Sequence, residues 1–302
     1  MTDLKKVHSG GAWLVLSAAL LWGTTGTAQT FAPAGFDPVV IGGLRLAIGG
    51  FFLMLLALSR REIRQLRSWP WKPVFLAAAA TATYQVCFFA AVAKTGVAVG
   101  TVVGIGSAPI IAGLIGFFFL GQRPGRRWGG ATFLAIIGCS LLALSSSQTD
   151  VQINPIGLLL ALVAGTAYAA YTFAIKELLK NHSPNAVMAV IVCMAALLLL
   201  PLLLGRELSW VLQPRGIAVV FYLGLFTMAL SYWLFARGLL ATQATTAVTL
   251  TLAEPMTAAL LGVAVVGEKL SIPAWAGLLL IGCGLLILTV PTQVLRMKVQ
   301  KW

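Results

Sequence analysis

Charged residues are scarce in this sequence, and acidic residues are the scarcest of them. Only 8 of its 302 residues are aspartate or glutamate, and all charged residues together make up 10% of the chain. Hydrophobic residues make up 59%. Soluble domains contain about 25% charged and about 45–50% apolar residues. The composition therefore excludes an ordinary soluble domain and indicates an integral membrane protein.

Residues that commonly carry chemistry are also few. Both histidines, His8 and His182, lie outside the long apolar runs, so we expect neither a buried metal site nor a histidine proton relay. No G-x-x-x-x-G-K-[ST] motif is present, which excludes a P-loop ATPase. No nucleophile, base and orienting residue are grouped, so we expect no enzyme activity and no cofactor. The four cysteines have no C-x-x-C spacing and are typical of small packing residues: Cys87, Cys139, Cys193 and Cys283.

Long apolar runs, by contrast, fill most of the chain. About 20 consecutive apolar residues are needed to cross the ~30 Å hydrocarbon core of a bilayer. Ten runs of this kind are present, at 11–32, 37–58, 73–93, 97–120, 128–146, 155–176, 185–204, 215–236, 243–265 and 272–291. We therefore expect an all-α membrane protein with ten transmembrane helices and no soluble catalytic domain. The first run is too long for a signal peptide and lacks a convincing A-x-A site, so we expect it to be retained.

Basic residues are distributed unevenly between the two faces of the membrane. Of the 21 lysines and arginines, 16 fall on the side of the N-terminus, 4 fall on the opposite side and Arg45 lies inside a run. The positive-inside rule then places both termini in the cytoplasm and residues 148–154 outside. The net charge of +13 is thus a topology signal, and we expect no nucleic-acid partner. The 16 are Lys5, Lys6, Arg60, Arg61, Arg64, Arg67, Lys72, Arg123, Arg126, Arg127, Lys176, Lys180, Arg237, Arg296, Lys298 and Lys301, and the 4 are Lys94, Arg206, Arg215 and Lys269.

The two halves of the chain resemble each other at a fixed spacing of 146 residues. The spacing holds without a gap over about 110 residues and aligns prolines and aromatic residues as well as aliphatic ones. Each half holds five expected spans, and because five is odd, the second half must enter the membrane from the opposite side. We therefore expect two inverted five-helix repeats, residues 1–150 and 151–302. Secondary transporters built this way bind substrate between the repeats, near the middle of the membrane.

Glu254 is the one carboxylate well inside an apolar run. A charge at the bilayer centre costs about 2.5–3.5 kcal/mol on insertion scales, so such a residue usually faces a protein interior or a watery cavity. Pro255 beside it has no backbone N–H and weakens the helix locally. At 1.5 Å of rise per residue, Arg45 lies ~12 Å from one membrane face and Glu254 lies ~16 Å from the other. Either the two share a cavity at this depth, or Arg45 snorkels to the surface and Glu254 is a satisfied structural acid.

Aromatic and hydroxyl side chains recur at corresponding places in the two halves. Trp22 and Tyr168 are 146 residues apart, and Tyr84 and Tyr232 lie in the third and eighth runs. Such residues either line a cavity between the halves or pack against helices and lipid. In the cavity interpretation, Glu254 binds a substrate's ammonium group, Arg45 binds its carboxylate and aromatic walls take its side chain. The predicted substrate site consists of Trp22, Arg45, Tyr84, Ser107, Tyr168, Tyr232 and Glu254.

Five short motifs carry a resemblance to a known family. They are Trp22 with Gly23, Arg45, Glu254 with Pro255, Gly267 with Glu268, and Gly121 with Gln122 as a degenerate copy of the last. Together with the length and the duplication, they make the chain similar to the drug/metabolite transporter superfamily, specifically its EamA-type members. The resemblance covers nearly the whole chain. It implies a ten-helix carrier that exports amino acids and related metabolites, carries nucleotide sugars or confers drug resistance.

We therefore expect a secondary transporter, an exporter of small metabolites and in particular of amino acids, that works by alternating access around a central cavity. The alternatives are a multidrug or cationic-compound exporter and, in a different class, an intramembrane enzyme or scaffold. The small multidrug members of the superfamily use a glutamate in the first helix, and this sequence has none there. The expected partners are a small-molecule substrate and membrane lipid, in a monomer or dimer in a bacterial-type inner membrane.

Overall fold

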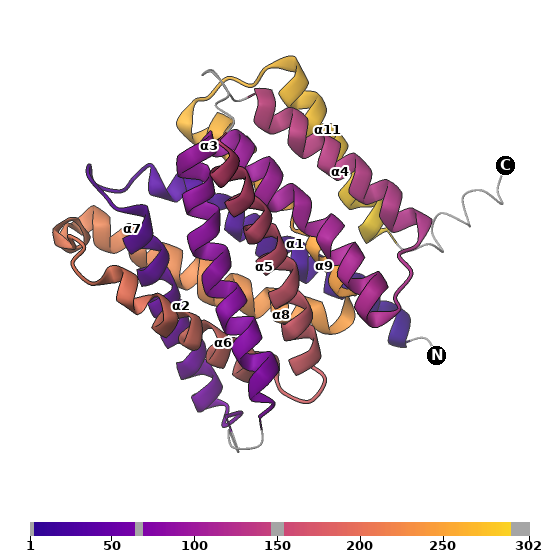
Figure 1. Cartoon of the computed structure of the whole chain (residues 1–302), viewed down its shortest axis with the longest axis horizontal. Coiled ribbons are helices and arrows are strands. Elements are labelled where there is room, and N and C mark those ends of the chain that lie inside the picture. The colour runs from indigo at the N-terminus through magenta and orange to yellow at the C-terminus, as the bar shows by residue number, and fades with distance from the viewer. Residues whose placement is uncertain (1–2, 64–68, 146–153, 291–302) are drawn as a thin grey trace.

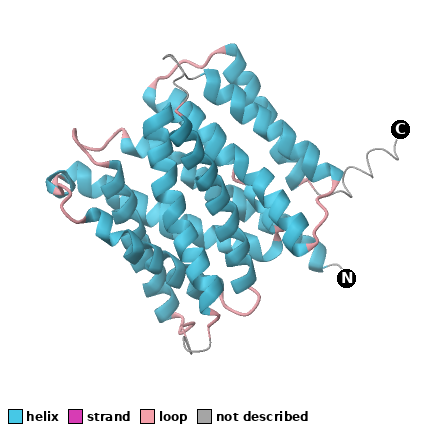
Figure 2. Ribbon diagram, viewed as in Figure 1, coloured by secondary structure: helices cyan, strands magenta, loops and turns pink. Residues whose placement is uncertain are grey.

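The computed structural model describes residues 3–63, 69–145 and 154–290, and the regular structure in these residues is entirely helical (Figures 1 and 2). This confirms the expected all-α membrane fold. The α-helices are α1 (Asp3–Gln29), α2 (Pro38–Ser59), α3 (Trp71–Leu120), α4 (Arg126–Ser145), α5 (Pro155–Leu178), α6 (Pro184–Leu199), α7 (Pro214–Gly224), α8 (Ser231–Ala241), α9 (Ala244–Leu250), α10 (Ala253–Leu261) and α11 (Ile272–Thr289).

Nine helical stretches in the described ranges are long and apolar enough to cross a membrane: Pro38–Ser59, Trp71–Gly96, Val99–Leu120, Arg126–Ser145, Pro155–Leu178, Pro184–Leu203, Pro214–Ala241, Ala244–Val266 and Ile272–Thr289. They match nine of the ten expected spans. The remaining expected span is α1, which has 27 residues and is therefore long enough to cross. Its second half is rich in glycine and threonine, which makes it more polar than the other helices.

Four of the expected spans are not single straight helices. The third and fourth spans form one continuous helix, α3, with a kink at Gly96, whose φ of 80° is readily adopted only by glycine. The eighth span consists of α7, a π-helical turn at Leu225–Leu230 (η4) and α8. The ninth consists of α9, α10 and a second π-helical turn at Gly262–Val266 (η5). Two short 3₁₀ helices, η2 (Leu200–Leu203) and η3 (Ser209–Leu212), connect α6 to α7.

The helices begin where the sequence places a capping residue before a proline. Asp37, Asn154 and Ser183 accept a hydrogen bond from the first turn of α2, α5 and α6, and each is followed directly by proline. The side chain satisfies one of the free N–H groups at the helix start, and the proline occupies a position that needs no donor. These signals explain why the observed starts agree closely with the apolar runs.

Gly121 and Gly267 end α3 and η5, and they are 146 residues apart. Both adopt the left-handed conformation, with φ values of 61° and 81°, and their N–H groups donate to the carbonyls of Gly116 and Gly262. A left-handed glycine is a common helix end because it lacks a Cβ atom. The glycine in each copy of this motif therefore has the same backbone role in both halves.

Glycines also allow helices from different halves to pack closely. Gly138 of α4 and Gly277 of α11 face each other so tightly that a Cβ atom on either would lie 2.5 Å from the other's carbonyl oxygen. In Figure 1 these two helices run side by side. Arg127, at the start of α4, donates to the carbonyls of Ile287 and Val290 at the end of α11. Small residues at such contacts are typical of helix association in membranes.

Several sequence predictions concern residues outside the described ranges. They include five of the expected cytoplasmic basic residues, the expected external residues 148–153 and the expected boundary between the halves at 150 and 151. The five basic residues are Arg64, Arg67, Arg296, Lys298 and Lys301.

Candidate binding cavity

A cavity of about 250 Å³ lies among α1, α2, α3, α5, α8 and α10. Helices from both halves of the chain contribute to it. Its lining combines one acid, one base, several aromatic rings and a few neutral polar groups, which is the usual make-up of a small-molecule site. The lining residues are Trp22, Gly23, Thr25, Gly26, Gln29, Arg45, Tyr84, Gln85, Phe88, Phe89, Val92, Thr101, Ile105, Tyr168, Tyr171, Tyr232, Glu254, Pro255 and Ala258.

Arg45 and Glu254 both line this cavity, which contradicts the alternative that Arg45 snorkels to the membrane surface. Arg45 is buried, with only 7% of its surface exposed. Its Nη2 donates to the carbonyl oxygen of Thr227 at 3.4 Å, and its Nε has no hydrogen-bond partner. The carboxylate of Glu254 makes no hydrogen bond or ion pair with any described residue, Arg45 included. The two charges therefore face one cavity without neutralising each other directly.

A break in the ninth span exposes Glu254 to the cavity. α9 ends at Leu250 and α10 begins at Ala253, so Glu254 lies in the first turn of a new helix. The N–H of Glu254 donates to the carbonyl of Thr251 at 2.9 Å, and the hydroxyl of Tyr168 donates to Thr251 Oγ1 at 2.8 Å. A negative charge is favourable at a helix N-terminus, where N–H groups lack helical partners. The break thus places the Glu254 carboxylate in the first turn of α10, beside the cavity.

The π-helical turn η4 holds the opposite charge in place. Thr227 lies inside this turn, and its carbonyl accepts hydrogen bonds from Arg45 and from Ser231 Oγ, the latter at 2.8 Å. Wide turns of this kind occur frequently at functional sites because they disturb the regular ladder of helical hydrogen bonds. Here the turn presents a carbonyl oxygen to a buried arginine 182 residues away in sequence.

Two aromatic groups form the walls of the cavity. On one side, Trp22 packs edge-on against Tyr232 at 5.3 Å between ring centres, and its Nε1 is buried without a hydrogen-bond partner. On the other side, Tyr168 packs against Tyr84 at 5.5 Å and against Tyr171 at 4.9 Å. Edge-on and tilted contacts are the favourable geometries for such rings. Each wall contains residues from both halves of the chain.

Gln85 is the most buried of the neutral, non-aromatic polar side chains in the lining. Only 4% of its surface is exposed, whereas Thr25, Gln29 and Thr101 are half-buried. No hydrogen bond links the Gln85 amide to any described residue. It therefore offers a donor and an acceptor to a molecule in the cavity.

The cavity extends from the middle of the helices toward one side only. Gln29 is the last residue of α1, and Val92 and Thr101 flank the kink of α3 at Gly96. Toward the start of α1, on the other side of Trp22, the side chains of Val15 and Ala18 are fully buried, so the cavity does not continue there. We refer to the side where α1 ends as the open side and to the side where α1 begins as the closed side.

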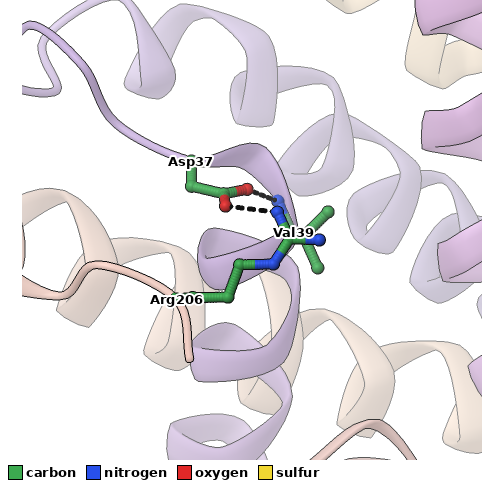
Figure 3. Close-up of polar contacts among 3 residues, drawn as sticks. All are labelled: Asp37, Val39 and Arg206. Carbon is green, nitrogen blue, oxygen red and sulfur yellow. Dashed lines mark hydrogen bonds and ion pairs between the residues drawn. The ribbon is translucent and has the colours of Figure 1, made fainter. Parts of the chain in front are cut away.

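Asp37 and Arg206 form an ion pair on the open side (Figure 3). Arg206 Nη1 donates to Asp37 Oδ2 at 2.6 Å, and the N–H of Val39 donates to Asp37 Oδ1 at 2.8 Å. Partial burial alone would raise the pKa of Asp37, but these two hydrogen bonds outweigh it and hold the pKa below its ordinary value of 3.8. The pair joins the start of α2 to the connection between η2 and η3.

Six of the seven predicted site residues line the cavity, and Ser107 does not. Its buried hydroxyl has no partner and lies against Gly165 of α5, so Ser107 belongs to a helix contact. Thr101 and Ile105 line the cavity from the same part of α3. These two are four residues apart and share a helix face, whereas position 107 points about 200° away from position 105. The position of Ser107 in the sequence repeat therefore predicted the correct helix but the wrong face of that helix.

Several lining residues were absent from the predicted set. Gln85, Phe88, Tyr171 and Gln29 lie close in sequence to predicted residues, and their helical spacing was the available signal. Thr101 could not be found from helical spacing. It follows the kink at Gly96, and the sequence does not define the direction of the helix after that kink. No cluster of three or more histidine, cysteine or acidic side chains suited to a metal ion occurs in the described part of the chain.

The fold and the cavity define a multi-pass membrane protein with a polar site enclosed by its helices. The EamA-like transporter family model matches the chain twice, at residues 9–144 and 155–290. The second match is shifted by 146 residues at both ends, which is the spacing of the sequence repeat. The chain therefore belongs to the EamA-like transporter family and is a membrane transporter.

Individual relatives agree with this assignment. The chain is 47% identical over 275 residues to the uncharacterized transporter YwfM of Bacillus subtilis, covering 91% of this chain and 92% of that protein. It is 24% identical over 287 residues to the uncharacterized inner membrane transporter YicL of Salmonella typhimurium, covering 92% and 95%. A solved crystal structure matches with a TM-score of 0.81 at 20% identity, covering 93% of this chain and 96% of that one. At this identity, the structural match shows a shared fold alone.

Proposed function

We propose that this transporter carries amino acids and releases them from the cell by alternating access. The observation that carries the proposal is a pair of opposite charges in the cavity whose hydrogen-bonding groups are not all satisfied. Arg45 Nε is a buried donor without a hydrogen-bond partner, and the Glu254 carboxylate forms no hydrogen bond or ion pair with any described residue. Buried charges are costly unless they are paired and hydrogen-bonded. A ligand with both a carboxylate and an ammonium group satisfies both residues at once.

The remaining lining residues complete this assignment. The aromatic walls around Trp22 and Tyr168 take the apolar part of an amino-acid side chain, and their flat surfaces favour broad rather than narrow selectivity. Gln85 supplies a neutral hydrogen-bonding group. In this proposal the predicted site residues other than Ser107 contact the substrate directly.

Alternating access follows from the proposed inverted repeat. The two matches to the family support two equivalent halves of five helices each. If the halves exchange conformations, the passage on the open side closes and an equivalent passage on the closed side opens. With the basic excess on the closed side, the positive-inside rule makes that side cytoplasmic and places the protein in a bacterial-type inner membrane.

A ligand screen on purified protein tests the substrate class. The screen compares the rise in melting temperature caused by three compounds. They are an amino acid, the amine that lacks its carboxylate and the acid that lacks its ammonium group. A ligand that binds only the folded state raises its stability. We expect the intact amino acid to stabilise the protein well above either fragment. Equal effects of all three, or of none, contradict an amino-acid site.

A second candidate is the export of organic cations. Glu254, which pairs with no described residue, shares the cavity with several aromatic rings and also suits a positively charged amine, because ring faces attract cations. In that case the amine fragment stabilises the protein at least as strongly as the amino acid does. Uptake of labelled substrate into inside-out vesicles tests for transport of an amino acid or of an organic cation. A transporter leaves the substrate chemically unchanged, whereas an intramembrane enzyme would form a product.

A further inference from the structure

Lys176, near the end of α5, is hydrogen-bonded to the end of α8. Its Nζ donates to the carbonyl oxygens of Leu240 and Thr242, at 3.1 Å each, and to that of Leu239. The last carbonyls of a helix have no partner within the helix, and a cation beside them is favourable. We refer to Lys176 and these three carbonyls as the Lys176 clasp. It joins two helices on the closed side.

The repeat shows how differently the two sides are packed. Four residues that line the cavity on the open side are Gly26, Gln29, Phe89 and Thr101. Their counterparts 146 residues later are Thr172, Ile175, Phe235 and Ala247, and all four are 0% exposed. The equivalent passage on the closed side is therefore filled by packed side chains.

The open side has no equivalent of the Lys176 clasp. The counterpart of Lys176 is Thr30, whose hydroxyl donates to the carbonyl of Thr27 within the same helical end. The counterparts of the three acceptors are residues 93, 94 and 96 at the kink of α3. No hydrogen bond joins Thr30 to these three described residues. A cation thus joins the ends of α5 and α8 on the closed side, whereas the described residues at the equivalent positions of α1 and α3 form no such bridge on the open side.

We propose that the Lys176 clasp is the latch that holds the cytoplasmic passage closed. The proposal rests on the alternating-access function proposed above. Opening the closed side requires the ends of α5 and α8 to separate, as the cavity separates the end of α1 from the kink of α3 on the open side. That separation breaks all three hydrogen bonds of Lys176. The latch therefore favours the conformation that is open to the outside, and its loss shifts the population toward the conformation that is open to the cytoplasm.

Thiol labelling at two equivalent positions tests the latch. Gly26→Cys and Thr172→Cys are made singly in full-length protein whose four native cysteines have been replaced, and they report the open and closed sides. Each is combined with Lys176→Met, which keeps the length of the side chain and removes its donors. Lys180→Met is the matched control, because Lys180 lies four residues further on, is exposed and forms an ion pair with Glu177 at 2.6 Å. Lys176→Arg retains the charge and the donors.

We expect Lys176→Met to slow labelling of Gly26→Cys and to speed labelling of Thr172→Cys. Each rate should change about tenfold, the order expected when hydrogen bonds to a charged group are lost from one of two conformations. Lys176→Arg and Lys180→Met should resemble the parent. If Lys176→Met matches Lys180→Met, or speeds labelling at both positions, the lysine is a purely structural helix cap and the latch is wrong.

Adding an amino acid to the parent protein separates this proposal from the proposed function. If an amino acid changes labelling at the two positions but Lys176→Met does not, the latch alone is contradicted. If neither position of the parent responds to any amino acid and no transport is measured, the proposed function is contradicted and the latch with it. Opposite responses of the two positions to both the ligand and Lys176→Met support both proposals.

Discussion

Arg45 of α2 donates a hydrogen bond from Nη2 to the carbonyl oxygen of Thr227, inside the π-helical turn before α8. The two residues belong to different halves of the chain, so this contact connects the halves at the cavity. The Nε of Arg45 is buried and has no hydrogen-bond partner. The geometry of the guanidinium, and not only its charge, is therefore expected to matter.

Arg45→Lys tests this point, because lysine keeps the charge but lacks the planar group that reaches Thr227 and a ligand together. We expect the affinity for an amino acid to fall about tenfold or more, in line with the loss of a hydrogen bond to a charged group. Isothermal titration of the purified variant measures the change. Arg206→Lys, an equivalent substitution outside the cavity, should bind as the parent does. Unchanged affinity in Arg45→Lys would exclude direct contact with the ligand.

Glu254→Gln removes the negative charge of the cavity with almost no change in shape. Because the carboxylate forms no hydrogen bond or ion pair with any described residue, we expect the variant to fold with a melting temperature close to that of the parent. Transport should fall by at least about tenfold, since the ammonium group of the ligand loses its counter-charge, or it should lose its dependence on pH. Glu268→Gln, an exposed residue near the end of the same span, serves as the control. Transport equal to that of the parent at every pH would make Glu254 a structural residue.

The accuracy of the sequence predictions differs between the fold and the site for physical reasons. The spans could be predicted because each must be apolar over its whole length. The first residues of α2 and α5 could be predicted because Asp37 and Asn154 act as caps before prolines. Arg45 and Glu254 could be singled out because a buried charge is rare in a membrane. Ser107 could not be placed correctly, because the face that a helix turns to a cavity depends on packing against Gly165.

Local irregularities could not be predicted at all. The kink at Gly96 and the break between Leu250 and Ala253 depend on hydrogen bonds to neighbouring helices, such as that from Tyr168 to Thr251. An apolar run with a proline is compatible with a straight, kinked or broken helix. These irregularities nevertheless decide which side chains reach the cavity, Thr101 among them.

The ion pair of Asp37 and Arg206 leads to a prediction about pH. Because the pKa of Asp37 is lowered in the folded protein, its contribution to stability is present above its ordinary pKa of 3.8 and is lost as the pH falls through the lowered value. Arg206 is 43% exposed, so Arg206→Gln should cost at most about 1 kcal/mol at neutral pH. Asp37→Ala also removes the cap of α2 and should cost about 1–2 kcal/mol.

Thermal melting of the purified variants in a series of buffers measures both effects. The difference between Arg206→Gln and the parent should shrink and disappear at a pH below the pKa of Asp37, where the aspartate is neutral. Asp37→Asn, which retains a capping side chain, should resemble Arg206→Gln more than Asp37→Ala. A difference between Arg206→Gln and the parent that persists in strong acid would show that Arg206 acts through another contact.

The uneven distribution of basic residues predicts the orientation of the protein in the membrane. We expect both termini in the cytoplasm, since basic residues are concentrated on the side where α1 begins. Fusions of a reporter that is active only in the periplasm should be inactive at the C-terminus and active when inserted at residues 148–154. The opposite pattern would reverse the assignment of the open and closed sides to the outside and the cytoplasm.

The last prediction concerns a substrate site shared by both halves. If the cavity binds the substrate, single cysteines placed on its walls should be labelled more slowly when an amino acid is present, because the ligand covers them. Ser107→Cys should show no protection, since Ser107 lies in a helix contact, and neither should cysteines replacing Leu56 and Leu198, which do not line the cavity. Protection at positions of one half only, or at none, would contradict the shared site. The four wall positions are Trp22, Tyr84, Tyr168 and Tyr232.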